Sequence, residues 1–217
     1  MNETNTTQRL RLYLIRHGEV EGAAAGKLLG RTDAPLSARG LDQSRELAET
    51  LSTANLAAIY SSDLQRALVM AETIAKRCDL KVQKSNAWRE IDMGDWEGRT
   101  MASLHAEAPG LVARLFDDAA SFEYPGGESF AAFTARVQTA LGHLLTAHES
   151  GEAVLVAHGG VCRTIIGTML GMPIQNWLRL AQDYGCLNVI DWYGTNPVLR
   201  LLNDGYEFGI RQSTSGL

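Results

Sequence analysis

The sequence has few cysteines, no long apolar run and no surplus of basic residues. Its 217 residues include only three cysteines, Cys78, Cys162 and Cys186. An odd number of cysteines, with no two close together, argues against a disulfide framework and against a zinc site built from cysteine pairs. A reducing cytoplasm is the simplest setting for such a chain.

Charge and hydropathy argue against two further classes of protein. The chain has 20 basic and 25 acidic residues, a net charge of −5, whereas nucleic-acid binders usually carry a basic surplus. No apolar run approaches the ~20 residues that span a bilayer, and the first residues, MNETNTTQR, lack the apolar stretch of a signal peptide. We therefore expect a cytoplasmic protein with no nucleic-acid or membrane partner. A local cluster of Arg and His can still capture an anion.

Strand-like and helical patterns alternate along the chain. Short apolar runs indicate strands, and longer stretches with apolar residues at helical spacing indicate helices. The alternation predicts an α/β fold, a three-layer sandwich with a mostly parallel central sheet flanked by helices. The expected strands are 10–15, 56–60, 81–83, 153–157, 187–192 and 198–202, and the expected helices are 39–53, 63–78, 100–107, 110–119, 128–149 and 161–170.

The domain organisation is simple. We expect a flexible N-terminal tail at 1–8 and a single domain over 9–217. The stretch 86–127 is less regular and rich in glycine and proline turn signals, so we expect it to form a small helical lid beside the sheet. In sheets of this type, ligands bind outside the carboxyl ends of the strands.

Three of the expected strands lead into polar or charged residues. The first leads into Arg16 and His17, the second is followed by Arg66, and the third leads into His158 and Gly159. If these strands are parallel, their ends face one crevice, which then holds two histidines and two arginines.

This set of residues suits a phosphate. Planar guanidinium groups match phosphoryl oxygens, and because Gly159 and Gly160 lack side chains, backbone N–H groups at the N-terminus of the following helix can approach an anion. A neutral, oriented histidine can serve as a covalent nucleophile, and a second can stabilise the developing charge. The leaving oxygen also needs a proton. The candidate acids in the lid, between which the pattern does not choose, are Glu90, Asp92, Asp95 and Glu97.

Each of these signals is weak when taken alone. An Arg-His-Gly at a strand end is usually a polar turn, and His-Gly-Gly is usually a helix entry, so the argument depends on their joint placement. His105, His143 and His148 have no such placement, and we interpret them as surface or helix-face residues. Trp88 and Trp96 fit either a substrate mouth or the core.

Six ordered motifs run through residues 10–203: LIRHGE at 14–19, GRTDAPLSARG at 30–40, SSDLQRA at 61–67, REIDMGDWEG at 89–98, PGGES at 125–129 and VAHGGV at 156–161. On these motifs the chain resembles the histidine phosphatase superfamily, which includes the cofactor-dependent phosphoglycerate mutases. The resemblance implies the same α/β fold and a phosphohistidine intermediate, with no metal and no bound cofactor.

The resemblance also implies a role for each matching residue. His17 corresponds to the nucleophile, and Glu90 to the usual proton donor. Glu19 corresponds to a supporting residue near the pocket. Relatives often carry Asn six residues after the nucleophile, where it helps to hold phosphate, but this chain has Ala23. The residues that correspond to the phosphate pocket are Arg16, Arg66, His158 and Gly159.

The branch of the superfamily is open to two interpretations. Mutases usually carry a longer lid with paired arginines, whereas the segment from Glu90 to Pro125 is short and has only isolated Arg99 and Arg114. We therefore expect a phosphomonoesterase acting on a small phosphorylated metabolite, and the closest resemblance is to α-ribazole phosphatases of cobalamin biosynthesis. The alternatives are phosphoglycerate mutase-type transfer and a non-catalytic phosphate-ligand binding protein. A homodimer is compatible with the sequence.

Overall fold

The computed structural model describes residues 9–205, so the tail expected at 1–8 and the end of the expected domain, 206–217, lie outside the described residues. The strands are β1 (Arg9–Arg16), β2 (Leu56–Ser62), β3 (Val82–Ser85), β4 (Gly151–Ala157), β5 (Leu187–Tyr193) and β6 (Asn196–Asp204). The α-helices are α1 (Ala38–Thr50), α2 (Gln65–Cys78), α3 (Met101–Glu107), α4 (Pro109–Asp117), α5 (Phe130–Ala147) and α6 (Gly159–Met169).

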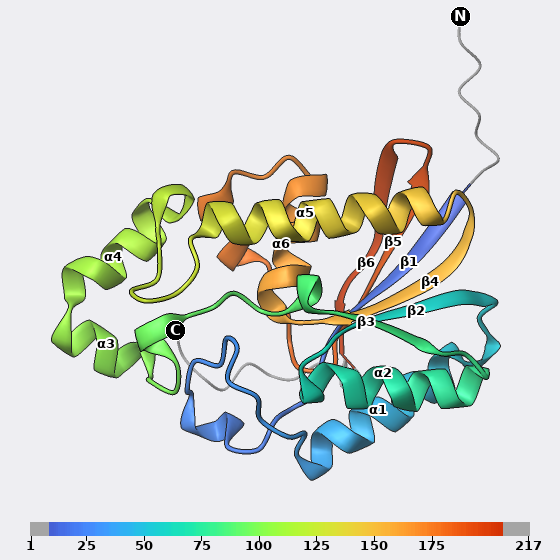
Figure 1. The fold of residues 1–217 in the computed structure, drawn as a ribbon, viewed down its shortest axis with the longest axis horizontal. Coiled ribbons are helices and arrows are strands. Elements are labelled where there is room, and N and C mark those ends of the chain that lie inside the picture. Colours follow the sequence, from blue (N-terminus) through green and yellow to red (C-terminus); the bar gives the residue numbers. More distant parts are fainter. Residues whose placement is uncertain (1–8, 206–217) are drawn as a thin grey trace, which may run out of the picture.

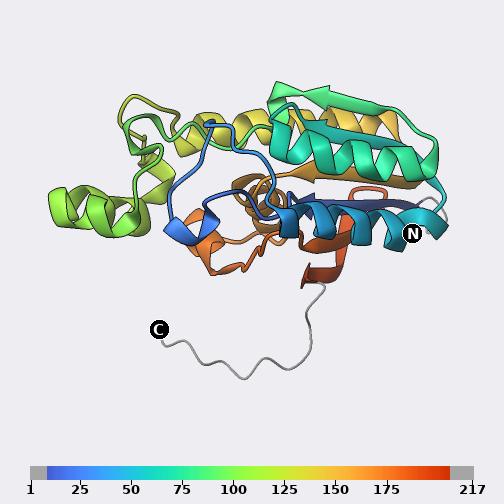
Figure 2. The same cartoon turned by 90° about the horizontal axis from the view of Figure 1, so that it is seen from below.

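The six strands form one sheet in the order β3-β2-β4-β1-β5-β6. The pairs β2–β3, β2–β4 and β1–β4 are parallel, whereas β5 runs antiparallel to both β1 and β6. Helices α1 and α2 cover one face of the sheet, and α5 and α6 cover the other (Figures 1 and 2). The expected α/β fold with a mostly parallel sheet is confirmed.

The core has two halves, one on each face of the sheet. Along β4, Ala153, Leu155 and Ala157 belong to the apolar cluster under α5 and α6, while Val154 and Val156 belong to the cluster under α1 and α2. Successive side chains of a strand point to opposite faces. Because both faces of β4 are covered, its sequence is continuously apolar rather than alternating.

The lid lies beyond the end of the sheet, where α3 and α4 project away from the strands (Figure 1). Trp88 and Trp96, both in the part of the lid that precedes α3, lie in the core, and each residue is only 3% exposed. The Trp96 ring packs edge-on against Tyr124, with 5.3 Å between ring centroids. Of the two interpretations of these tryptophans, the structure therefore supports core packing.

The boundaries of the helices differ from the predictions by one to three residues. The last helix begins at Gly159 rather than at Val161, and the carbonyl of His158 accepts the first helical hydrogen bond, from the Cys162 N–H at 2.9 Å. The sequence pattern did not predict this first turn, because Gly159 and Gly160 are poor helix formers. Between residues 9 and 205, no helix is long and apolar enough to cross a membrane.

Candidate active site

His17 lies directly after β1, where its backbone is held on both sides. Its N–H donates to the Ala157 carbonyl at the end of β4, at 3.0 Å, and its own carbonyl accepts from the Gly185 N–H at 2.9 Å. The side chain is only 5% exposed. The parallel pairing of β1 with β4 thus sets the position of His17 at the carboxyl edge of the sheet.

The hydrogen bonding of His17 determines which ring nitrogen is free. The Nδ1 atom lies 2.8 Å from the Gly18 carbonyl oxygen. A carbonyl can only accept a hydrogen bond, so Nδ1 carries the proton, and Nε2 of the neutral ring keeps its lone pair. Burial lowers the pKa of His17 well below its usual 6.5, and the charges of Arg16 and Arg66 lower it further. At neutral pH the ring is therefore uncharged and nucleophilic at Nε2.

His158 follows β4 and faces His17, with 5.1 Å between the ring centroids. Its Nδ1 accepts a hydrogen bond of 3.3 Å from Nε of Arg66. Because Arg66 holds that proton, neutral His158 carries its own proton on Nε2. The Nε2 atom is buried and has no hydrogen-bond partner in the structure. Burial and the charge of Arg66 lower the pKa of His158 well below 6.5.

Arg66 comes from the first turn of α2 and is only 1% exposed. Besides contacting His158, its guanidinium donates to the carbonyls of Thr32 at 2.7 Å and Gly30 at 2.6 Å. It also lies 3.7 Å from the carboxylate of Asp33. Arg66 therefore orients His158 and at the same time holds the 30–33 loop against the site.

Arg16, the last residue of β1, is fixed by a loop that precedes β5. One terminal nitrogen donates to the Gln182 carbonyl, and the guanidinium carbon lies 3.9 Å from the centroid of the Tyr184 ring. Its Nε is buried without a hydrogen-bond partner. The Tyr184 ring also contacts His17, with 5.6 Å between centroids. No local pattern in the sequence indicated that Tyr184 contacts Arg16.

Glu90 is the only one of the four candidate acids that lines the cavity beside His17. One oxygen of its carboxylate accepts from the Gly160 N–H at 2.8 Å, and the other accepts from its neighbour, the Ile91 N–H, at 2.9 Å. These bonds fix the carboxyl group at the start of α6. Each carboxylate oxygen retains a further lone pair that can carry a proton.

The other three acids have structural positions. Asp92 pairs with Arg31 at 3.0 Å. Glu97 accepts from the N–H groups of Gly30, Arg31 and Thr32, bonds that lower its pKa against the opposing effect of burial. The Asp95 carboxylate lies against Gly126. None of these three acids lines the cavity beside His17.

The cavity beside His17 has a volume of about 370 Å³. Arg16, His17, Glu90 and Gly159 all line it, together with Arg163, which the sequence analysis did not single out. Nε of Arg163 donates to the Leu180 carbonyl at 2.9 Å. Arg163 lies four residues after Gly159 in α6, and residues at this spacing share a helix face. That periodicity could have identified it.

Four of the positions singled out in the sequence lie outside the cavity lining: Arg66 and His158, described above, and Glu19 and Ala23. The Glu19 carboxylate accepts a 2.8 Å hydrogen bond from the Ser37 hydroxyl, and the Glu19 N–H donates to the Gln43 side chain. Glu19 thus joins the loop after His17 to the start of α1. Ala23 packs against the apolar cluster beneath α1 and α2.

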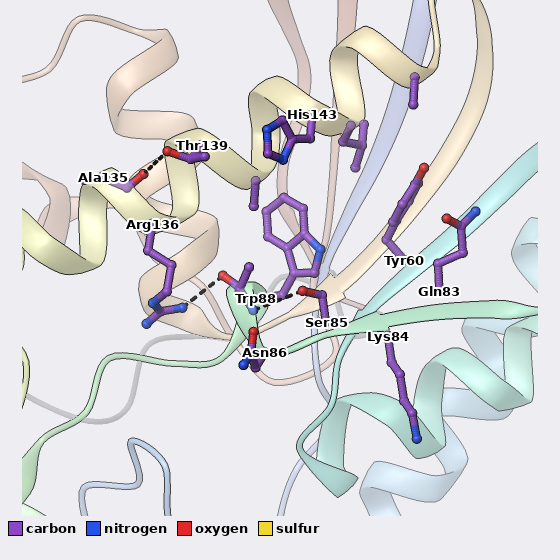
Figure 3. Close-up of a pocket in the computed structure, with 14 residues that line it drawn as sticks. Tyr60, Gln83, Lys84, Ser85, Asn86, Trp88, Ala135, Arg136, Thr139 and His143 are labelled. Carbon is purple, nitrogen blue, oxygen red and sulfur yellow. Dashed lines mark hydrogen bonds between the residues drawn. The ribbon is translucent and has the colours of Figure 1, made fainter.

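A larger groove of about 750 Å³ lies between β3 and α5 (Figure 3). Tyr60, Trp88 and His143 line it, whereas none of the residues predicted for catalysis does. Arg136 at its edge is already engaged by the Glu128 carboxylate and by backbone carbonyls. Of the remaining histidines, His148 accepts from or donates to the Tyr60 hydroxyl at 2.8 Å, and His105 is exposed on α3.

Among residues 9–205, no group of three or more His, Cys, Asp or Glu side chains is arranged to hold a metal ion. The independence from metal and cofactor remains a prediction.

The fold and the site together define an α/β protein with a cluster of two histidines and two arginines at the carboxyl edge of a mostly parallel sheet. The model of the histidine phosphatase superfamily (branch 1) matches residues 12–205, and the chain belongs to this superfamily.

Comparison with known proteins gives relatives of more than one activity. The chain is 37% identical over 190 residues to "Probable phosphoglycerate mutase GpmB" of Proteus mirabilis, covering 88% of each chain. Among solved structures, it resembles the α-ribazole phosphatase of Shigella flexneri, with 30% identity, a TM-score of 0.81 and coverage of 89% and 96%. It also resembles a mycobacterial glucosyl-3-phosphoglycerate phosphatase, with 29% identity, a TM-score of 0.82 and coverage of 91% and 100%.

Proposed function

We propose that this protein is a phosphomonoesterase that transfers the phosphoryl group of a small metabolite to His17 and then to water. One observation carries the proposal. Two buried donors have no hydrogen-bond partner: Nε2 of His158, whose ring centroid lies 5.1 Å from that of His17, and Nε of Arg16, the residue before His17. Buried polar atoms are rarely left unpaired, and a phosphoryl group would accept from both donors. A phosphoryl group bound by these donors would lie near the neutral ring of His17.

In the first step, Nε2 of His17 attacks phosphorus and the bond between phosphorus and the ester oxygen breaks. The leaving oxygen takes a proton from the Glu90 carboxyl group, so the alcohol departs neutral. Arg16, Arg66 and His158 stabilise the charge on the equatorial oxygens. Arg66 would act mainly by holding His158, because its own donors are engaged by carbonyls and by that ring.

In the second step, water attacks the phosphorus of phosphohistidine, and the bond between nitrogen and phosphorus breaks. The Glu90 carboxylate, left unprotonated by the first step, accepts the proton of the attacking water. Orthophosphate and neutral His17 result, which restores the starting state. In this scheme Gly159 adds space beside Arg16, and Glu19 supports the loop after His17.

Phosphoglycerate mutase-type transfer is the second candidate, because curated relatives bear that name. The lid favours hydrolysis. Arg99 is paired with Glu107 on α3, and neither Arg99 nor Arg114 lines the cavity, so the lid provides no pair of arginines for a substrate carboxylate. We propose α-ribazole 5′-phosphate as the first substrate to test, on the likeness to an α-ribazole phosphatase.

The test is a panel of initial rates of phosphate release. The panel contains α-ribazole 5′-phosphate, 3-phosphoglycerate, sugar phosphates and p-nitrophenyl phosphate, each with the wild type and with His17→Ala. We expect turnover that His17→Ala abolishes, and near-normal rates in that variant would overturn the mechanism. Interconversion of phosphoglycerates without phosphate release would support the mutase. Binding of phosphate without either reaction would support a non-catalytic binder.

A further inference from the structure

The cavity beside His17 is lined by both charged and apolar residues. The charged lining residues are Arg16, Lys27, Glu90 and Arg163. Most other lining side chains are aliphatic or aromatic, and they come from three separate segments of the chain. They include Leu28 and Leu29 of the N-terminal loop, Met101, Leu115 and Phe116 of the lid, and Leu178 of the 3-10 segment Ile174–Arg179.

Two of these apolar side chains are exposed at the surface. Phe116 on α4 is 49% exposed, and Leu178 is 46% exposed. They belong to elements far apart in the sequence, yet both line the same cavity. Exposed large apolar side chains that line a concave site commonly mark a ligand-binding surface.

A second cavity of about 110 Å³ adjoins the first, and its lining is also mainly apolar. Met93 and Leu178 line both cavities, and so does Glu90. The smaller cavity continues past the carboxyl group of Glu90 to Phe130 and Trp177. The group expected to protonate the leaving oxygen therefore lies at the start of an apolar space.

A strongly hydroxylated leaving group would fit this lining poorly. Its hydroxyls would lose water and find few partners, which costs free energy for each unpaired group. An aliphatic or aromatic group would instead gain by leaving water.

We infer that the apolar wall formed by Leu28, Met101, Leu115, Phe116 and Leu178 is a leaving-group subsite, and that the protein favours phosphomonoesters whose leaving alcohol carries an aliphatic or aromatic group. This inference rests on the proposed function for its orientation, since phosphate must lie at His17 for the alcohol to reach the wall. Of the charged residues that line the cavity, Lys27 is the nearest in sequence to this wall.

The test measures binding separately from catalysis. n-Alkylphosphonates from methyl to hexyl, whose bond between carbon and phosphorus resists hydrolysis, are titrated into the wild-type protein by calorimetry. Burial of each added methylene group should lower Kd about twofold to fourfold, until the alkyl chain is long enough to extend out of the cavity into solvent. The n-alkyl phosphates of the same lengths, whose leaving groups are almost equally basic, should show a parallel rise in kcat/KM.

A matched pair of variants locates the effect. Leu178→Asn removes an apolar side chain that lines both cavities, and it should weaken hexylphosphonate at least fivefold more than methylphosphonate. Leu170→Asn is the control. Leu170 is 48% exposed, much like Leu178, and lies outside both cavities, so this variant should keep the wild-type dependence on chain length.

The outcomes separate this inference from the proposed function. A Kd that does not depend on chain length, in a protein that still hydrolyses p-nitrophenyl phosphate, overturns the subsite alone. A steep dependence in a protein that hydrolyses none of the esters supports the subsite and overturns the phosphatase. Failure of every phosphonate to bind overturns both. An equal effect of Leu178→Asn and Leu170→Asn would overturn the placement of the subsite.

Discussion

Gly160→Ala should impair Glu90, the proposed proton donor, by displacing its carboxyl group while leaving the residue itself unchanged. A Cβ atom at position 160 would lie 2.1 Å from one oxygen of the Glu90 carboxylate and 3.0 Å from its carbon. Heavy atoms do not approach to 2.1 Å, and residue 160 lies in the first turn of α6. We therefore expect the Glu90 carboxyl group to move away from the cavity by about 1 Å, which weakens its 2.8 Å bond to the Gly160 N–H.

The expected size of the effect depends on the leaving group. Misplacing a reacting group by about 1 Å can cost roughly 100-fold in rate, which lies within the range of roughly 10²–10⁴ that general acids contribute. We expect kcat/KM for an alkyl phosphate to fall about 100-fold, equivalent to about 2.7 kcal/mol. For p-nitrophenyl phosphate, whose leaving group needs little protonation, the fall should stay below about fivefold.

The assay compares these two substrates in the wild type, Gly160→Ala, Glu90→Gln and the double variant. Gly142→Ala on α5 is the control, because a Cβ there meets no heavy atom within 4 Å. If both changes act on one proton transfer, Gly160→Ala should add little to Glu90→Gln. Far-ultraviolet circular dichroism checks that each variant is folded.

Equal slowing of both substrates by Gly160→Ala would refute this reasoning, because it would mean that the change disturbs phosphate binding rather than protonation. Unchanged rates for both would show that Glu90 does not donate the proton. Fully additive effects in the double variant would indicate that the two residues act independently.

Three further predictions concern the remaining parts of the site. Tyr184→Ala should raise the inhibition constant of orthophosphate about tenfold, because the ring packs on the guanidinium of Arg16. Tyr184→Phe, which keeps the ring, should have the wild-type constant. An unchanged constant in Tyr184→Ala would mean that the Gln182 carbonyl alone holds Arg16. Folding lowers the pKa values of His17 and His158, so below about pH 6.5 the unfolded chain binds more protons than the folded protein. The free energy of unfolding should therefore fall as pH decreases, by up to about 1.4 kcal/mol per pH unit for each histidine. Urea titrations from pH 7.5 to 5 measure this slope, which should be roughly halved in His17→Gln, and a flat profile would contradict it. EDTA should leave phosphate release unchanged, whereas strong inhibition would indicate a metal-dependent mechanism.

Much of the architecture followed from local patterns. The run 153–157 predicted a central strand because a strand covered on both faces has no polar side, and β4 has that environment. The helix start at Gly159 was missed because glycine has low helix propensity, whereas the actual start depends on a hydrogen bond between Cys162 and His158.

The site was predictable where its residues follow strands and not where they come from loops. His17 and His158 follow neighbouring parallel strands, so topology alone brings them together. Tyr184 contacts Arg16 across more than 160 residues, through a loop whose shape depends on buried amide contacts among Gln182, Asn188 and Asn203. No periodic pattern encodes a contact of that kind.

The hydrogen bonds of Arg66 limit how this protein could be re-engineered. One guanidinium group contacts His158 and also holds the carbonyls of Gly30 and Thr32. A loop grafted between β1 and α1 to alter specificity would have to present two carbonyl oxygens at the same two points, or the His158 ring would lose its support. Lysine could not replace this arginine, because it has no planar fork with which to reach three acceptors. Diversity in that loop is therefore better sought before residue 30 than at residues 30–32.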